Sequence, residues 1–412
     1  MNTSTIKNLY AFVLGREQKF ALEELKAVLS RHNFIFDINS LSGNIVFLNL
    51  PSANEASIAS LTQQLAGTIK IFRITADRSG DLADQVYATV QQERPKISGK
   101  LNFGLSSYAQ DVGIKLVRAV GIEVKSLIKQ EQSVRFVSPQ DGKELSSVVV
   151  LKNHLVNKGV EIGIFPQHVG VLVALNDPEA WSKRDYGKPA GDKYSGMVPP
   201  KLARMMVNIA LGEVAADASR PSSPNCLVID PFCGSGNILT EALLSGCSVL
   251  GSDISDKAVN NTKKNLDWLA QSYPDVQSLY RQVRRADATS ANLTPMEPIP
   301  RGTTVVITEP YLGSPKKFNP SYIEAKKEYA MVRDLYLSFF RNARQLKAQS
   351  PVFLVIFPLV ALRDGSAYSL YNQSVDEIRR LGYTQIREPL VYGREYQVVK
   401  RQIVLLALQN DF

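Results

Sequence analysis

The chain is poor in the residues that build disulfide frameworks and metal sites. Its 412 residues include only three cysteines, three histidines and two tryptophans. Cys226, Cys233 and Cys247 show no CxxC spacing and lie far in sequence from every histidine. This pattern predicts neither a paired cysteine framework nor a metal site, and it favours a reducing, cytoplasmic compartment.

Long apolar runs are also missing. No stretch approaches the roughly 20 consecutive apolar residues that a membrane-spanning helix needs. The opening stretch, MNTSTIKNLYAFVLG, lacks the basic start and long apolar core of a secretion signal. We therefore expect no membrane partner. With 44% hydrophobic and 21% charged residues, the chain has the composition of a globular protein that buries a core.

Acidic residues are fewer than basic ones, which leaves a formal net charge of +9 at neutral pH. Clustered lysines and arginines attract phosphate groups over long distances, so this excess permits a nucleic acid as partner. Many basic proteins bind no nucleic acid, however, and the charge alone does not decide the matter.

Local patterns of apolar residues divide the chain into four parts. Residues 1–75 alternate strand and helix patterns and predict a small, ferredoxin-like α+β domain. Residues 76–177 predict a second α+β module. Residues 178–200 are rich in proline, glycine and charge, as expected for a linker. In residues 201–412 strands and helices alternate, which predicts a doubly wound, parallel α/β sheet with helices on both faces.

The stretch CLVIDPFCGSGNILTEAL (226–243) predicts a ligand-binding loop between a buried strand and a helix. Its glycines let the backbone approach a ligand where a Cβ would clash. A Walker loop would need Gly-Lys-Ser/Thr here, whereas Gly236 is followed by Asn-Ile. A dinucleotide loop would need a third glycine where Leu239 stands. The remaining interpretation is a loop that holds the amino-acid and ribose parts of S-adenosylmethionine.

Acidic residues end three successive strand patterns in this region. Asp230, Asp253 and Asp287 each stand at the edge where such a sheet binds ligands. On this interpretation Asp253 accepts hydrogen bonds from the ribose and Asp287 from the adenine amino group. Helix capping could also explain each acid singly. The predicted cofactor-binding residues are Asp230, Cys233, Gly234, Ser235, Gly236, Asn237, Asp253, Ile254, Asp287 and Ala288.

The fourth strand pattern, VVITEPYLG (305–313), ends in an acid, a proline and an aromatic ring. It is similar to the D/N/S-P-P-Y/F tetrapeptide of amino-directed methyltransferases. In that motif a carboxylate and a backbone carbonyl accept the N–H bonds of a base amine, which turns its lone pair toward the methyl group. The ring stacks on the flipped base.

The match departs from the tetrapeptide in one respect. Aligned without a gap, Glu309 takes the acid position and Pro310 that of the first proline, but Tyr311 arrives one residue early. A second alignment places Thr308 at the acid position instead. We prefer the first alignment because it keeps the acid and the glycine in place, so the predicted catalytic residues are Glu309, Pro310 and Tyr311.

Longer segments extend the resemblance to one family. Residues 226–313 resemble a Rossmann-fold, S-adenosylmethionine-dependent RNA methyltransferase. The segments 182–210 (SKRDYGKPAGDKYSGMVPPKLARMMVNIA) and 10–29 (YAFVLGREQKFALEELKAVL) are similar to parts of THUMP-domain tRNA guanine-N2 methyltransferases. The resemblance covers most of the chain. It implies a THUMP-like RNA-binding module within residues 76–177, S-adenosylmethionine as cofactor, and methylation of the N2 amine of a tRNA guanosine, most often at position ten.

The resemblance leaves alternatives open. The chain could methylate a guanine in ribosomal RNA or an adenine in DNA, and the altered tetrapeptide also permits a tRNA-binding homologue without catalysis. A partner subunit is undecided. The residues predicted to contact RNA phosphates are Lys152, Lys158, Lys183, Arg184 and Lys188, although a solvated linker explains the last three equally well.

Overall fold

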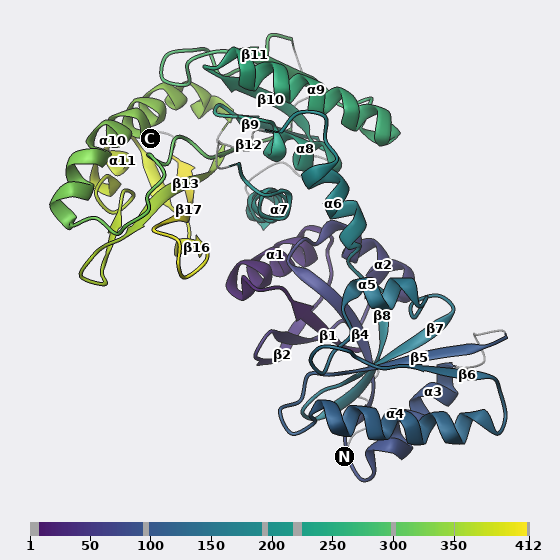
Figure 1. Cartoon of the computed structure of the whole chain (residues 1–412). Coiled ribbons are helices and arrows are strands. Elements are labelled where there is room, and N and C mark those ends of the chain that lie inside the picture. Colours follow the sequence, from purple (N-terminus) through teal and green to yellow (C-terminus); the bar gives the residue numbers. More distant parts are fainter. Residues whose placement is uncertain are drawn as a thin grey trace. The chain divides into compact units, whose positions relative to one another are not determined.

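A computed structural model of the chain describes residues 8–93, 99–191, 197–216, 225–297, 302–349 and 351–409. The chain divides into two compact units. The first comprises Met1–Leu25 and His32–Ala180, and the second comprises Lys26–Arg31 and Trp181–Phe412. Each unit is built on one large sheet (Figure 1).

The first unit contains an eight-stranded mixed sheet in the order β2-β3-β1-β4-β8-β7-β5-β6. Its strands are β1 (Leu9–Leu14), β2 (Asp37–Ser42), β3 (Ile45–Asn49), β4 (Thr68–Asp77), β5 (Leu101–Ser107), β6 (Val134–Val137), β7 (Gly159–Ile164) and β8 (His168–Leu175). The helices that begin in this unit are α1 (Gln18–Arg31), α2 (Glu55–Gln64), α3 (Leu82–Glu93), α4 (Ile114–Lys129), α5 (Ser147–Lys152) and α6 (Pro178–Tyr186).

The two predicted N-terminal parts, residues 1–75 and 76–177, contribute strands to this same sheet. They are joined because β4 pairs antiparallel with β8, from Lys70↔Leu175 to Asp77↔His168. One face of the sheet is covered by α3 and α4, whose apolar residues recur three to four positions apart and so lie on one side of each helix. Helix α5 packs on the other face.

The second unit contains a nine-stranded sheet. Its strands are β9 (Cys226–Asp230), β10 (Ser248–Asp253), β11 (Arg281–Arg285), β12 (Thr303–Thr308), β13 (Val352–Ala361), β14 (Ala367–Ser369), β15 (Tyr383–Gln385), β16 (Leu390–Tyr392) and β17 (Val399–Leu408). Its helices are α7 (Pro200–Ala216), α8 (Asn237–Leu244), α9 (Asp256–Ser272), α10 (Tyr322–Ala343) and α11 (Val375–Arg380), with short 3-10 turns at Pro274–Val276 and Arg344–Gln349.

The strand order of this sheet, β11-β10-β9-β12-β13-β17-β15, fixes where a ligand can bind. Strands β9 to β13 are mutually parallel, as predicted, whereas β17 runs antiparallel to β13. The order reverses between β9 and β12, because the chain builds outward from β9 in one direction and from β12 in the other. Such a switch point opens a crevice outside the carboxyl ends of the strands.

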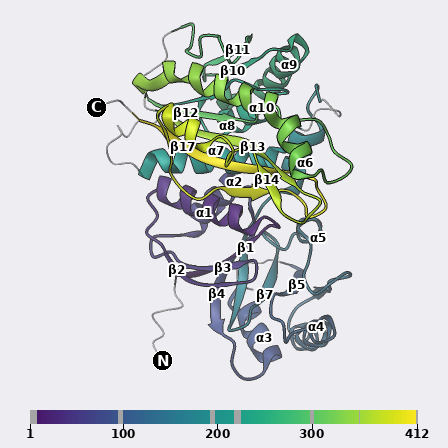
Figure 2. The same ribbon diagram turned by 90° about the vertical axis from the view of Figure 1, so that its left-hand side faces the viewer.

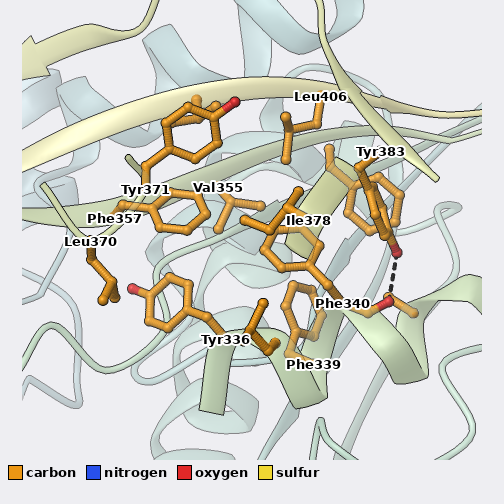
Figure 3. Close-up of a cluster of buried hydrophobic side chains, with 14 of the residues drawn as sticks. Tyr336, Phe339, Phe340, Val355, Phe357, Leu370, Tyr371, Ile378, Tyr383 and Leu406 are labelled. Atoms are coloured by element: carbon orange, nitrogen blue, oxygen red, sulfur yellow. Dashed lines mark hydrogen bonds between the residues drawn. The ribbon is translucent and has the colours of Figure 1, made fainter. Parts of the chain in front are cut away.

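Aromatic residues form much of the core of the second unit (Figure 3), where α10 packs on the sheet (Figure 2 labels α10 and several of the strands). Tyr336, Phe339 and Phe340 of α10 pack on the side of the sheet that carries Phe357. Tyr383 closes the cluster and donates a hydrogen bond to the Phe340 carbonyl (2.9 Å). Helices α7 and α8 contact β9, β10, β12 and β13. Strand β13 is buried along most of its length, as expected for a central strand covered on both faces.

The segment 178–200, predicted as a linker, begins with helix α6. Asp177 caps this helix by accepting the Glu179 N–H (2.8 Å), and Pro178 stands at its first position, where a missing N–H costs little. Trp181 is buried, and its ring centre lies 4.0 Å from the guanidinium carbon of Arg184. The sequence did not predict this packed helix, because charged residues and glycines are frequent in the segment.

The cysteine prediction is wrong in one respect, because Cys226 and Cys247 form a disulfide. Cys226 begins β9 and Cys247 immediately precedes β10, and the parallel pairing of Leu227 with Ser248 places the two cysteines side by side. The 21-residue separation gave no spacing signal. The cytoplasmic location, inferred from unpaired cysteines, stays a prediction. In the described ranges no helix is long and apolar enough to cross a membrane.

Candidate functional site

The glycine loop connects β9 to α8 through two left-handed residues. Gly234 has φ +55° and Gly236 has φ +82°, a region that favours glycine. A Cβ on Gly236 would lie 2.8 Å from the Thr262 methyl group, so both conformation and space require glycine there. The loop closes with a hydrogen bond from the Gly236 N–H to the Cys233 carbonyl (2.8 Å). Asn237 then begins α8.

Asp230 lies fully buried at the tip of β9 and reaches across the switch point to β12. Its Oδ1 accepts hydrogen bonds from the Thr308 hydroxyl (2.6 Å) and the Phe232 N–H (3.2 Å). Burial raises the pKa of Asp230 to about 7, and the carboxylates of Asp253 and Glu309 add to the rise, while the two hydrogen bonds oppose it. Thr308 thus has a structural role in the site that the preferred alignment did not give it.

Asp253 ties the tip of β10 to the glycine loop. Its Oδ2 accepts the Gly234 N–H (3.0 Å) and its Oδ1 accepts the Ser255 N–H (2.9 Å). Asp287 follows β11 and is exposed, and its Oδ1 accepts the N–H (2.8 Å) and hydroxyl (2.7 Å) of Thr289. Asp287 therefore caps its own turn while its second oxygen remains available to a ligand. Beside these acids, Ile254 is exposed and Ala288 is buried.

Cys233 is a packed loop residue. It is buried, and burial raises the pKa of its thiol well above the usual value, an effect that nearby Asp230 and Asp253 reinforce. Its sulfur lies 3.7 Å from the Thr262 hydroxyl. A thiol that resists ionisation is a poor nucleophile, so the geometry favours a contact role.

The segment that precedes α7 is fastened to the glycine loop. The Ser235 hydroxyl donates to the Met197 sulfur (2.8 Å), and the Asn237 amide donates to the Val198 carbonyl (2.7 Å). Asn265 of α9 donates to the carbonyls of Ser235 (2.8 Å) and Ala190 (2.7 Å) and accepts the Ala190 N–H (2.9 Å). Ser195 and Gly196, which directly precede Met197, lie outside the described residues.

The amine side of the site is built on Glu309, which directly follows β12. Only 11% of its side chain is exposed, and Arg401 of β17 pairs with it through Nε to Oε1 (2.5 Å) and Nη2 to Oε2 (3.3 Å). Burial raises the pKa of Glu309, and the Arg401 guanidinium opposes that rise. Sequence reasoning missed Arg401, because it lies 92 residues downstream in an unremarkable strand pattern.

The rest of the TEPYLG turn separates a buried residue from an exposed ring. Pro310 is buried, whereas Tyr311 is 55% exposed, with its hydroxyl 3.2 Å from that of Ser314. Gly313 has φ +88°, and a Cβ there would lie 2.8 Å from the Tyr329 hydroxyl. Tyr329 in turn donates to the Leu312 carbonyl (3.1 Å). Tyr329 of α10 therefore holds the turn in place.

The five predicted RNA-binding residues differ in accessibility. Lys152 and Lys158 are exposed, and Lys183 is exposed with its ammonium 6.0 Å from the Trp268 ring centre. Lys188 is half-buried and donates to the Asn237 side chain (2.6 Å), and burial lowers its pKa. Arg184 is buried and pairs with Glu241 (2.8 Å), so it supports the fold, and its contact with RNA stays a prediction.

The donor chemistry of the described residues points to an organic cofactor. Among them, no group of three or more His, Cys, Asp and Glu side chains could hold a metal ion. The β9 tip instead offers glycines with positive φ, which let a ligand approach the backbone, and carboxylates on neighbouring strands. These groups suit a ligand that carries an amino acid and a ribose, since both are recognised by hydrogen bonds.

Comparisons with known proteins agree with this geometry. No protein-family model matches the chain. A tRNA (guanine(10)-N2)-dimethyltransferase of Methanothermobacter thermautotrophicus is 45% identical over 102 residues, which span 24% of this chain and 27% of that protein. The enzyme of the same name from Methanocaldococcus jannaschii is 25% identical over 270 residues, 61% of this chain and 69% of that protein. The match to the Methanothermobacter protein thus spans only about a quarter of that protein's length.

Solved structures show the fold over nearly the full length. A structure titled as a possible methylase from Clostridium difficile superposes with a TM-score of 0.50 at 12% identity, and it covers 98% of both chains. At this identity the likeness concerns architecture alone. The α/β sheet of the second unit, with its mixed β13–β17 edge, is therefore a methyltransferase-type fold preceded by an α+β unit.

Proposed function

We propose that the chain is an S-adenosylmethionine-dependent RNA methyltransferase that acts on the N2 amine of a tRNA guanosine, most often at position ten. One observation carries the proposal. The Asp230–Thr308 hydrogen bond joins the strand that enters the glycine loop to the strand that ends in TEPYLG. The residues predicted for the cofactor and for the amine therefore share one edge of the sheet. The names of the two archaeal relatives supply the substrate.

The cofactor would lie against the glycine loop. Gly234, Ser235 and Gly236, with Asp230, would receive its methionine part, and Asp253 would accept the ribose hydroxyls. Asp287 and the backbone around Ala288 would face the adenine. Cys233, Asn237 and Ile254 border these positions. The positive sulfonium and ammonium groups would favour the ionised form of Asp230, whose burial otherwise opposes ionisation.

The amine would react from the TEPYLG side. Glu309 and the Pro310 carbonyl would accept its two N–H bonds, and Tyr311 would stack on the base. The cofactor would supply a methyl group on a positively charged sulfur, which would leave as a neutral thioether when the amine takes the methyl group. The amine would release one proton to water. Such a transfer depends mainly on orientation of the two reactants.

The first unit would serve the RNA. We propose that it contains the THUMP-like module, with exposed Lys152 and Lys158 in contact with phosphates. Lys183 would contribute from α6. The excess of 48 basic over 39 acidic residues supports a polyanionic partner.

The direct test is transfer of labelled methyl from S-adenosylmethionine to unmodified total tRNA, followed by nucleoside digestion and mass spectrometry. We expect labelled N2-methylguanosine or N2,N2-dimethylguanosine. Label on ribosomal RNA or DNA alone would contradict the tRNA substrate but keep the methyl transfer. Cofactor binding without label on any nucleic acid would indicate a tRNA-binding homologue that lacks catalysis.

A further inference from the structure

Glu309 and Arg401 form a nearly buried ion pair at the tip of the central strands. Their side chains are only 11% and 15% exposed, and both carboxylate oxygens accept from the guanidinium. Loss of one partner from such a pair is costly, because the other charge stays buried without compensation. The pair therefore links the residue predicted for the amine to a strand that the motif does not include.

The sheet register places Arg401 at the carboxyl edge. Arg401 lies opposite Pro358 in the β13–β17 ladder, and β12 ends where Thr308 pairs with Val355. Pro358 therefore lies three residues beyond Val355, where the β12–β13 pairing ends, and so stands level with the TEPYLG turn. The guanidinium reaches back from β17 to Glu309 at this level.

Arg401 also contacts the cofactor side. Its Nη2 lies 3.4 Å from the Met197 carbonyl, and the sulfur of Met197 accepts the hydroxyl hydrogen bond of Ser235 in the glycine loop. One guanidinium therefore contacts both the acid of the amine side and the segment fastened over the cofactor loop. Few single side chains could hold the two halves of the site in register in this way.

We propose that Arg401 is a positioning residue for methyl transfer, which holds the Glu309 carboxylate in place to receive the target amine. This inference rests on the proposed function. A carboxylate offers about four lone-pair sites, so two remain after the arginine contacts. One of the remaining sites can accept an N–H of the target amine, while the Pro310 carbonyl accepts the other.

The charge balance around Glu309 supports the same role. Titratable groups face it from three elements: Arg401 from β17, Asp230 from β9 and Tyr336 from α10. Asp230 repels a second negative charge, and the Tyr336 hydroxyl is neutral and donates to the Ile356 carbonyl (2.9 Å). Arg401 is the positive group among them. Its removal would raise the pKa of Glu309 and so protonate the acceptor at a higher pH.

The test measures kcat and KM for tRNA methylation from pH 5 to 9 at saturating cofactor, where titration of Asp230 has little influence on cofactor occupancy. We expect wild-type activity to fall on the acidic side as Glu309 protonates. Arg401→Gln should lower kcat at neutral pH by about 100-fold, the scale of a misplaced catalytic group. It should also move the acidic fall in activity, here called the acidic limb of the pH profile, to higher pH. Arg401→Lys should keep the acidic limb at the wild-type pH and should lower kcat about tenfold, because a single ammonium charge replaces the planar guanidinium.

Arg333→Gln is the matched control, since it breaks the half-exposed Arg333–Glu377 pair of α10 and α11. It should leave the limb and kcat unchanged. If the acidic limb of Arg401→Gln lies at the same pH as in the wild type, the inference is overturned and the proposed function still stands. A wild type that methylates no RNA would overturn both. If Arg401→Gln does not fold, as circular dichroism would show, Arg401→Lys decides: wild-type kcat in that variant would overturn the inference.

Discussion

On the cofactor side of the candidate site, the chain is held by backbone geometry and by hydrogen bonds between nearby turns. Two glycines with positive φ shape the loop, and the Asp253 carboxylate accepts one of its N–H groups. On the amine side, the key acid is held by a side chain 92 residues away. The first arrangement depends on the loop's own backbone and on the tip of the neighbouring strand. The second depends on how distant strands meet.

The difference has a functional meaning. A loop fixed by its own backbone can bind a constant ligand in many related proteins, because side chains around it can vary. An acid fixed by a distant arginine can be adjusted independently, through any change in that partner. The cofactor half is therefore expected to tolerate surrounding changes that would redirect the amine half.

Replacement of Glu309 should separate the two sides most strongly. Glu309→Ala should lower kcat for methyl transfer by about 100- to 1000-fold, the scale of losing one polar group directed at the transition state. The dissociation constant of S-adenosylmethionine, measured by calorimetry, should stay within about twofold of wild type. Glu213→Gln, which breaks the Glu213–Arg387 pair of the same unit, is the control. Undiminished turnover in Glu309→Ala would refute the amine role.

Substitution of a glycine tests the backbone side. Gly236→Ala should destabilise the fold by about 1–3 kcal/mol and weaken cofactor binding, because the left-handed conformation and the contact with Thr262 both oppose a Cβ. Gly246 is the matched control, with φ +83° and no heavy atom within 4 Å of a Cβ. Gly246→Ala should incur only the conformational cost. Equal losses of cofactor affinity in the two variants would contradict the close approach at Gly236.

The pH dependence of cofactor binding should show a smaller effect. With a pKa of about 7, buried Asp230 is mostly protonated at pH 6 and mostly ionised at pH 8. A positively charged cofactor prefers the ionised form, so its affinity should rise about tenfold between these values. Asp230→Asn should abolish this dependence. An unchanged slope in that variant, measured by calorimetry at pH 6, 7 and 8, would assign the titration to another group.

Local patterns predicted most elements but not all of their connections. The strands and helices from Cys226 to Thr308 follow the predicted order, because buried strands and amphipathic helices repeat in short, regular units. The shared sheet of residues 1–75 and 76–177 was not predicted, since it depends on the pairing of β4 with β8 across about a hundred residues. The Cys226–Cys247 disulfide was missed for the same reason.

For the site, the sequence located residues whose position follows from their neighbours. Asp253 stands at the tip of β10, where the alternation of strands placed it, and its contact with a ribose stays a prediction. The burial of Arg184 against Glu241 was not foreseen, because a charged residue in a polar stretch gives no sign of it. The partner of Glu309 could be found only from the strand register, which no local pattern contains.

The hydrogen bonds of residues 188–190 and 197–198 near the glycine loop have a consequence for ligand binding. Lys188, Ala190, Met197 and Val198 each make a hydrogen bond to the loop, to the start of α8 or to Asn265, which itself contacts the loop. These bonds hold the loop in shape before a ligand arrives. A cofactor that binds against the loop would therefore lose less of its affinity to ordering of the protein.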